Sequence, residues 1–577
     1  MTDSFDPAAT FASKSAGPGK REWLIALLLS LATALAIVSP FLFKGNASGH
    51  DFSFHAASWI DAAAQWRDGI ILPRWTDGAN HGFGEPRFIF YPPISWIFGA
   101  VLSFIVPWIY VPAIFIVLTQ TLAGLSAFAL GRRLFALRGA LLCTLLYAAN
   151  PYALLIVYMR SDFAEQFAMI FFPLMFLVAM EVFDVLETPG RTRLRSIAFL
   201  AVTFAAVWVT NAPAGVVASY SLGALLIFSC IAAKSWRPAL YGTAALILGL
   251  GIAGFYLVPA IHEQHWVNIT QALASGLAPA QNFLYTTIAD EEHNAFNRIA
   301  SDSALLMVLL TAFFSAISYV GNRKRPNAPI KAPLRNALIV LSALSTFLML
   351  RFSLVFWQLL PKLRFVQFPW RWMSILAIPF ACFLAAGATQ KRFRWYEAAA
   401  VTSLIIVILA GTAAYMVQHT WWDSEDVPTL LEAQQKDEGF EGVDEYDPAG
   451  DDHSSLPEKS PRVTLLRLRG NAAARDAKIH VEIWDAETKE LRIDSREPVR
   501  LSLRLLNYPA WRVQVNDQVV APLQPTGETN QMVLPLAAGS SHVVVQFVRT
   551  TDRTLGGALT ILSILVLLFV QAEPQRL

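Results

Sequence analysis

The sequence predicts a polytopic α-helical membrane protein of about 12 transmembrane helices with a β-sandwich domain near its C-terminus. Of the 577 residues, 55% are hydrophobic and only 15% are charged, which is too apolar for a soluble chain of this length. The apolar residues gather into runs of about 20, the length that an α-helix needs to cross roughly 30 Å of hydrocarbon. A β-barrel would show short alternating segments instead.

Twelve apolar runs are long enough to span a bilayer. They cover residues 22–43, 111–130, 138–157, 165–184, 196–213, 214–233, 239–260, 303–321, 335–352, 373–389, 396–417 and 555–572. A further apolar stretch, residues 94–107, begins after Tyr91-Pro92-Pro93 and is ambiguous by its length. We expect it to form a juxtamembrane or re-entrant helix that does not cross, because the basic loops then all face one side.

The basic loops predict the orientation, since Lys and Arg concentrate on the cytoplasmic side. These loops contain Arg132, Arg133 and Arg138; Arg191, Arg193 and Arg195; Lys234 and Arg237; residues 323–335; and residues 391–394. We therefore predict a multi-pass protein of the plasma (inner) membrane with both termini in the cytoplasm. Segments 44–110, 261–302, 353–372 and 418–554 then lie outside.

Four regions follow from this pattern. Residues 1–21 form a cytoplasmic tail, 22–417 a transmembrane domain with a long first outer loop at 44–110, 418–554 an extracytoplasmic domain, and 555–577 the last helix and tail. The extracytoplasmic domain opens with an acidic linker, residues 423–452. Residues 478–484, 499–505, 511–515 and 542–548 then alternate with a period of two, and Asn516-Asp517 signals a turn, which favours an antiparallel β-sandwich.

Charge and cysteine content exclude several classes of function. The net charge is +2 and the basic residues lie in short loops, so no nucleic-acid partner is expected. Cys143, Cys230 and Cys382 fall inside apolar runs, where a thiol behaves as a small buried hydrophobe, so neither a disulfide framework nor a CxxC metal site is available. The spans carry almost no ionisable residues near their centres, which disfavours an ion-coupled carrier.

Polar residues gather instead at the predicted outer ends of the helices. The groups are Asp51 and His55 after the first span, Glu85 in a Gly-rich loop at 77–87, Arg160, Asp162 and Glu165 before the fourth span, and Arg371 among aromatic residues. Each group also has a structural interpretation as an interfacial cap, a turn, a partner of a helix dipole or an aromatic anchor. His262, Glu263 and His265 with residues 290–293 could ligate a metal, but their spacing matches no zinc pattern. No metal site is assigned, and a divalent metal stays open as a cofactor.

Dispersed motifs resemble a known family. Residues 51–55, 66–75, 82–86, 90–93, 160–165 and 368–371 are similar to the membrane proteins called 6-pyruvoyl-tetrahydropterin synthase-related, and Asn507-Tyr-Pro-Ala-Trp511 resembles YfhO-like proteins. The zinc site of the soluble pterin synthase has no counterpart, so that activity is not implied. The architecture resembles the GT-C glycosyltransferases, whose donor is typically a polyprenyl-phosphate-linked sugar and whose first-loop carboxylate is the catalytic or substrate-binding acid.

The resemblance implies roles for these residues. Asp51 matches the catalytic carboxylate, which would take a proton from a cell-envelope glycan, lipid or protein acceptor. Arg160 and Arg371 would bind the donor phosphate, because a guanidinium presents a planar fork of donors. The remaining candidates for substrate binding are His55, Glu85, Asp162 and Glu165.

Two other functions remain compatible with the sequence. A lipid or solute transporter or flippase suits a chain with this many helices, although no internal repeat and few midplane charges support one. A non-catalytic envelope scaffold that presents residues 418–554 is the second alternative.

Overall fold

The computed structural model describes residues 18–186, 192–322, 330–389, 394–468, 473–474, 477–524 and 529–572. Several sequence predictions lie outside these residues: most of the N-terminal tail, the end of the C-terminal tail, Arg191 and much of the basic loops at 323–335 and 391–394. The orientation of the chain across the membrane therefore stays a prediction.

Ten helices of the described residues are long and apolar enough to cross a membrane. Short segments extend some of them: α3 (Phe41–Lys44), η1 (Trp108–Tyr110), α10 (Pro151–Leu155), α11 (Phe163–Ala168) and η8 (Pro369–Trp372). The main helices are α2 (Lys20–Val38), α8 (Val111–Leu134), α9 (Leu137–Ala148), α12 (Phe171–Val182), α14 (Ala212–Ala233), α17 (Glu291–Asn322), α18 (Ala332–Met349), α20 (Met373–Ala388), α21 (Trp395–His419) and α23 (Thr551–Ala572).

The ten or eleven spans agree with the predicted number of about 12, but two of the predicted runs are not straight, full-length spans. The run at 239–260 is a pair, α15 (Arg237–Ile252) and α16 (Gly254–Glu263), bent by 74°, and counting it as one span gives eleven. The run at 196–213 is α13 (Arg193–Trp208), whose 16 residues rise about 24 Å, less than the roughly 30 Å of a hydrocarbon core. Glycine explains the bend, because Gly251 and Gly254 flank it and weaken the helix.

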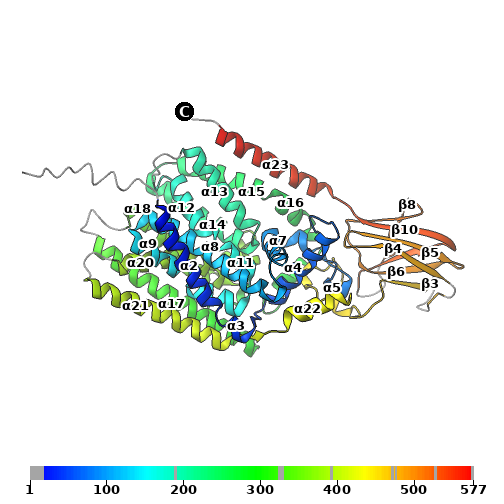
Figure 1. Cartoon of the computed structure of the whole chain (residues 1–577). Helices are drawn as coiled ribbons and strands as arrows, with labels where there is room; N and C mark the ends of the chain where they lie inside the picture. Colours follow the sequence, from blue (N-terminus) through cyan, green and yellow to red (C-terminus); the bar gives the residue numbers. More distant parts are fainter. Residues whose placement is uncertain are drawn as a thin grey trace, which may run out of the picture.

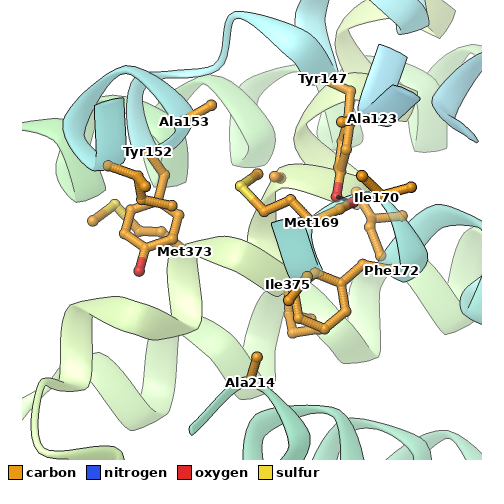
Figure 2. Close-up of a cluster of buried hydrophobic side chains, with 14 of the residues drawn as sticks. Ala123, Tyr147, Tyr152, Ala153, Met169, Ile170, Phe172, Ala214, Met373 and Ile375 are labelled. Atoms are coloured by element: carbon orange, nitrogen blue, oxygen red, sulfur yellow. Dashed lines mark hydrogen bonds between the residues drawn. The ribbon is translucent and has the colours of Figure 1, made fainter. Parts of the chain in front are cut away.

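The helices pack around α20, in which every side chain is buried. Figure 2 shows part of this core, where Met373 and Ile375 of α20 lie near Tyr152 of α10 and Phe172 of α12. The hydroxyl of Tyr147 donates to the carbonyl of Met169 at 2.8 Å, so the buried polar atom is satisfied. The core is therefore continuous across helices from both halves of the chain.

The first loop, residues 44–110, is folded rather than extended. It contains β1 (Asn46–Ala47), α4 (Phe52–Arg67), α5 (Ala79–Gly82), α6 (Arg87–Phe90) and α7 (Pro93–Leu102). The ten residues of α7 rise only about 15 Å, too little to cross a bilayer. The expectation that residues 94–107 do not cross agrees with this length.

Two further loops contain short helices. The segment after α16 contains η3 (Gln264–Trp266), η4 (Ile269–Leu273) and η5 (Pro279–Gln281). The segment before α20 contains η6 (Arg351–Ser353), α19 (Leu354–Leu359) and η7 (Leu363–Val366).

The C-terminal domain is the predicted antiparallel sandwich. One sheet has the strand order β4-β5-β10-β7-β8 and the other β3-β6-β9. The strands are β3 (Val463–Arg467), β4 (Lys478–Trp484), β5 (Thr488–Ser495), β6 (Val499–Leu506), β7 (Trp511–Val515), β8 (Gln518–Val519), β9 (Gln531–Leu536) and β10 (Gly539–Phe547). Asn516 and Asp517 both have positive φ, 49° and 64°, as a two-residue turn between β7 and β8 requires.

The acidic linker is packed against the first loop. Its strand β2 (Trp422–Asp423) pairs with β1, and α22 (Asp426–Gln435) packs on α4. The short turns η9 (Asp444–Tyr446) and η10 (His453–Ser455) follow. Trp75 and Phe83 of the first loop join the hydrophobic core of the sandwich. Figure 1 shows the result, with the strands gathered at one end of the helix bundle and α22 at the junction.

Candidate functional site

A break between α10 and α11 supplies the central charged residues. After α10 the chain forms a widened π turn, Ile156–Arg160, in which Ser161 N donates to Ile156 O at 2.7 Å. Ser161 takes the left-handed conformation, and Asp162 caps α11 by accepting Glu165 N at 2.9 Å. π turns occur often at functional sites.

The start of the first loop lies directly against this break. The amide of Asp51 donates to the carbonyl of Arg160 at 2.9 Å, and the amide of Gly49 donates to the Ser161 hydroxyl at 3.1 Å. A Cβ at Gly49 would lie 2.5 Å from the Met159 carbonyl oxygen, so only glycine allows this approach. These contacts place the Asp51 carboxylate beside Arg160.

Arg371, at the start of α20, joins the two buried carboxylates of the break. Its Nη2 lies 3.2 Å from Asp162 Oδ2 and its Nε 3.1 Å from Glu165 Oε2. Its Nη1 also donates to the Val366 carbonyl at 3.0 Å. The other carboxylate oxygen of Glu165 accepts from the Tyr152 hydroxyl at 2.5 Å. Arg371 is therefore largely saturated by protein partners, and it fixes both carboxylates.

Arg160 retains donor capacity. Its Nη2 forms an ion pair with Asp51 and lies 3.6 Å from Asp162, and its guanidinium lies over the rings of Phe368 and Trp370 at 4.9 and 5.4 Å. Its Nε is buried and has no hydrogen-bond partner among the described residues. A buried donor without a partner is costly, so an anionic ligand at this position would be favoured.

Electrostatics keep one acid charged and one base neutral at the site. Burial alone would raise the pKa of Asp162, but the hydrogen bond with His55 and the charges of Arg371 and Arg160 hold it below the usual value. The surrounding protein and the Arg160 charge lower the pKa of His50 to about 4, so this imidazole is neutral at pH 7 and can accept a hydrogen bond.

A cavity of about 1660 Å³ connects these groups with the apolar helices. At one end it is lined by His50, Asp51, Arg160, Asp162 and Arg371. At the other end it is lined by apolar side chains of α13, α15 and α23, which include Ile197, Ile247, Leu248, Leu562 and Val566. We call these two parts the polar end and the apolar limb.

The linker closes the cavity with residues that the sequence did not indicate. Val443, Glu445 and Tyr446 belong to its lining. Burial and the charge of Glu85 raise the pKa of Glu445 to about 7. The sequence shows this segment only as an acidic linker, and its aromatic residues Phe440 and Tyr446 are the one signal that it packs.

The predicted site residues divide into two groups. Asp51, Arg160, Asp162 and Arg371 line the cavity. His55, Glu85 and Glu165 are buried beside it and are not part of its lining. His55 Nε2 lies 3.5 Å from the Tyr91 hydroxyl and 3.6 Å from Asp162 Oδ1. Its position suits it to hold neighbours in place.

Glu85 connects the Gly-rich loop with the linker. It pairs with Arg87 at 2.6 Å and accepts Val443 N at 3.0 Å. Gly84 has φ +77°, and a Cβ there would lie 2.0 Å from Trp75 Nε1, so this glycine is required by the turn and by the packed indole. The loop is thus a structural support for the cavity wall.

Two clusters among the described residues could offer three ligand atoms to a metal ion: Asp444, Asp447 and His453, and Glu482, Glu490 and His542. In the first cluster the hydrogen bond with Asp447 raises the pKa of His453 to about 9, and a protonated imidazole does not ligate. The histidines of the predicted group at 262–265 are exposed, and Glu263 is held by Arg553 with both contacts at 2.7 Å. Its carboxylate is already neutralised by that arginine.

Comparison with family models identifies the chain. A model described as "6-pyruvoyl-tetrahydropterin synthase related domain; membrane protein" matches residues 88–417, more than half of the sequence. The chain belongs to this family. The match confirms the predicted resemblance, and it includes Arg160 and Arg371, whereas Asp51 and the linker lie outside it. A search of curated proteins found no match to the sequence.

Several solved structures are partly similar to this family member at low sequence identity. They include the arabinofuranosyltransferase AftD from Mycobacteria (16% identity, TM-score 0.42, 72% of this chain and 27% of that chain). The Archaeoglobus fulgidus oligosaccharyltransferase in the apo form matches at 12% identity and TM-score 0.43 over 70% of this chain and 57% of that chain. ArnT from Cupriavidus metallidurans bound to undecaprenyl phosphate matches at 13% identity and TM-score 0.40, over 73% of this chain and 76% of that chain. The chain thus spans about a quarter of the first and just over half of the second.

Proposed function

We propose that this protein is a membrane glycosyltransferase that moves a sugar from a polyprenyl-phosphate donor to a cell-envelope acceptor. The observation that carries the proposal is the continuity of the cavity. One space of about 1660 Å³ joins two carboxylates and two guanidinium groups to an apolar limb between helices. A lipid chain that carries a charged, sugar-bearing head needs this combination of surroundings in one site.

The apolar limb suits an isoprenoid chain. It follows α13 from Leu194 to Trp208, a rise of about 21 Å at 1.5 Å per residue. Its walls on α15 and α23 are also apolar, with Ile247 and Leu562 as examples. Burial of hydrocarbon against these side chains would contribute roughly 0.8 kcal/mol per CH₂ group.

Arg160 is the proposed phosphate-binding group. Its buried Nε has no partner among the described residues, and a guanidinium binds phosphate oxygens through parallel hydrogen bonds. Arg371, which is held by two carboxylates, would add positive charge and keep Asp162 in place. When phosphate binds Arg160, the guanidinium shifts part of its bonding away from Asp51 and releases that carboxylate.

Asp51 then acts as the base. An acceptor hydroxyl oxygen attacks the anomeric carbon of the donor, and its proton passes to the Asp51 carboxylate. The bond between the anomeric carbon and the phosphate oxygen breaks, and its electron pair leaves with the polyprenyl phosphate. Arg160 stabilises the negative charge that develops on that leaving group. The side chain of Asp51 is 31% exposed, which is consistent with access from the cavity.

Mass spectrometry of envelope glycans and lipid-linked sugars tests the proposal. We expect cells that carry a deletion or Asp51→Asn to lose the same glycan modification and to accumulate the same polyprenyl-phosphate sugar. Leu248→Trp, which fills the apolar limb, should have the same effect. Leu240→Trp is the matched control, because Leu240 is exposed on the same helix and does not line the cavity.

The alternatives give different results in the same experiment. A flippase or a scaffold predicts a phenotype for the deletion but wild-type glycans for Asp51→Asn. That outcome would show that Asp51 is not the base, and it would refute the proposed transferase.

A further inference from the structure

The linker segment 440–449 forms a fixed wall of the cavity. On one side, Phe440 N donates to Gly78 O at 2.8 Å and Val443 N donates to Glu85 at 3.0 Å. On the other side, Asn268 N donates to Asp447 O at 2.9 Å. Main-chain bonds to two different loops hold the segment in one position, so Glu445 and Tyr446 between them face the cavity from a rigid support.

Aromatic rings gather at this wall. Tyr446 stacks on Phe90 with ring centroids 5.9 Å apart and planes at 8°, and it lies 6.4 Å from Phe54. Phe54 meets Tyr91 edge-to-face at 4.7 Å. All four residues line the cavity. The Tyr91 and Phe54 side chains are only half-buried, so part of this aromatic surface is available to a ligand.

Glu445 adds a carboxyl group to the aromatic surface. It forms no ion pair with the described residues, and the neighbouring charged groups Glu85 and Asp51 are acids. Burial with these neighbours raises its pKa to about 7, so near neutral pH it can both donate and accept a hydrogen bond. A group of this kind suits hydroxyl ligands and disfavours anions.

The aromatic wall is separate from the arginine side of the cavity. Tyr91 lies between them, because its ring contacts Phe54 while its hydroxyl reaches His55, which lies beside Asp162. A phosphate would be repelled by Glu445 and attracted by Arg160. Asp51 belongs to the arginine side, where it forms an ion pair with Arg160.

We infer that Glu445, Tyr446, Tyr91 and Phe54 form the subsite for a sugar ring of the acceptor. The apolar C–H face of a sugar ring is buried favourably against aromatic rings, and its hydroxyls pair with the Glu445 carboxyl. This inference rests on the proposed function, and it narrows the acceptor from a glycan, lipid or protein to a molecule that presents a polyhydroxylated ring.

The test uses the purified full chain in lipid nanodiscs. Saturation-transfer NMR with a panel of methyl hexosides and methyl pentosides measures the subsite without any donor. Native mass spectrometry of parallel samples incubated with polyprenyl-phosphate sugar measures binding of the donor. The variants are Glu445→Gln, Tyr446→Leu and the ring-preserving Tyr446→Phe. The matched control is Glu441→Gln, because Glu441 is an exposed acid of the same linker.

We expect at least one methyl glycoside to bind the wild type, the control and Tyr446→Phe. Glu445→Gln and Tyr446→Leu should weaken that binding at least 10-fold while the lipid-linked sugar stays bound. Wild-type glycoside binding in both variants would overturn the subsite. Loss of the lipid-linked sugar in Glu445→Gln would also overturn it, because the ring bound there would then be the donor's. Glycoside binding without lipid-linked sugar on the wild type would instead refute the proposed donor.

Discussion

Replacing Trp75 by alanine tests whether the first loop and the sandwich form one folded unit. Trp75 is 0% exposed. Its ring lies 5.3 Å from Trp511, 5.7 Å from Phe547 and 5.9 Å from Tyr508. The indole therefore belongs to the first loop in sequence and to the sandwich in packing.

The cost of this substitution follows from the buried surface. An aromatic side chain buries about 150–250 Å², which at 25 cal/mol per Å² is worth about 4–6 kcal/mol. Measured truncations of buried Trp cost about 3–5 kcal/mol. A value of about 4 kcal/mol would raise the population in which loop and sandwich separate by roughly 10³-fold.

Hydrogen exchange of the full chain in detergent measures this population. Amides of β5, β7 and β10 should exchange faster in Trp75→Ala by a factor that reflects the lost free energy. Trp421→Ala is the control, because Trp421 is 74% exposed and its loss should change little. Equal exchange in the two variants, or no increase in Trp75→Ala, would refute the view that the loop completes the sandwich core.

Three further outcomes are expected. Gly84→Ala should lower the thermal unfolding midpoint, because the added Cβ meets the Trp75 indole at 2.0 Å at a residue with φ +77°; an unchanged midpoint would contradict that packing. Arg371→Lys should weaken binding of the lipid-linked sugar at least about 10-fold in native mass spectrometry, since an ammonium cannot hold both carboxylates in the same geometry; wild-type affinity would count against the arrangement. The pKa of Glu445 is raised from 4.5 to about 7, so its protonated form favours folding and this stabilisation is lost as the pH rises from 4.5 through 7. In thermal scans, the unfolding midpoint of Glu445→Gln should lack the part of the decline with pH that Glu445 causes in the wild type. Identical pH profiles of the wild type and the variant would refute this role of Glu445.

Local patterns predicted most elements of the fold. Residues 478–484 and 511–515 alternate with a period of two, and they are β4 and β7 with the same limits. The run at 239–260 reads as one apolar span, yet the chain bends there, and Gly254 at the bend lies against α23, where an added Cβ would be 3.2 Å from Gly556 O. A local hydropathy pattern cannot reveal that contact, because the contact involves a helix from the other end of the chain.

The candidate site could be predicted only in part. Asp51, Arg160 and Arg371 were recognisable because charged residues are rare in so apolar a chain. Their meeting depends on a left-handed Ser161 and on the close approach at Gly49, which no periodicity reveals. Glu445 was not recognised, because the acidic composition of its segment is typical of solvated linkers and its burial comes from main-chain bonds to distant loops.

The pairing of β1 with β2 has a consequence for synthesis of the protein. The hydroxyl of Ser48, next to β1, donates to the carboxylate of Asp426, which lies 378 residues later in the chain. At about 5–20 residues per second, a ribosome needs roughly 20–75 s to reach that partner. During this interval the nascent first loop has its charged residues in place but lacks one wall of its cavity. A chain truncated before the linker would therefore be an inserted but incompetent precursor, and the timing of elongation would decide how long the membrane contains it.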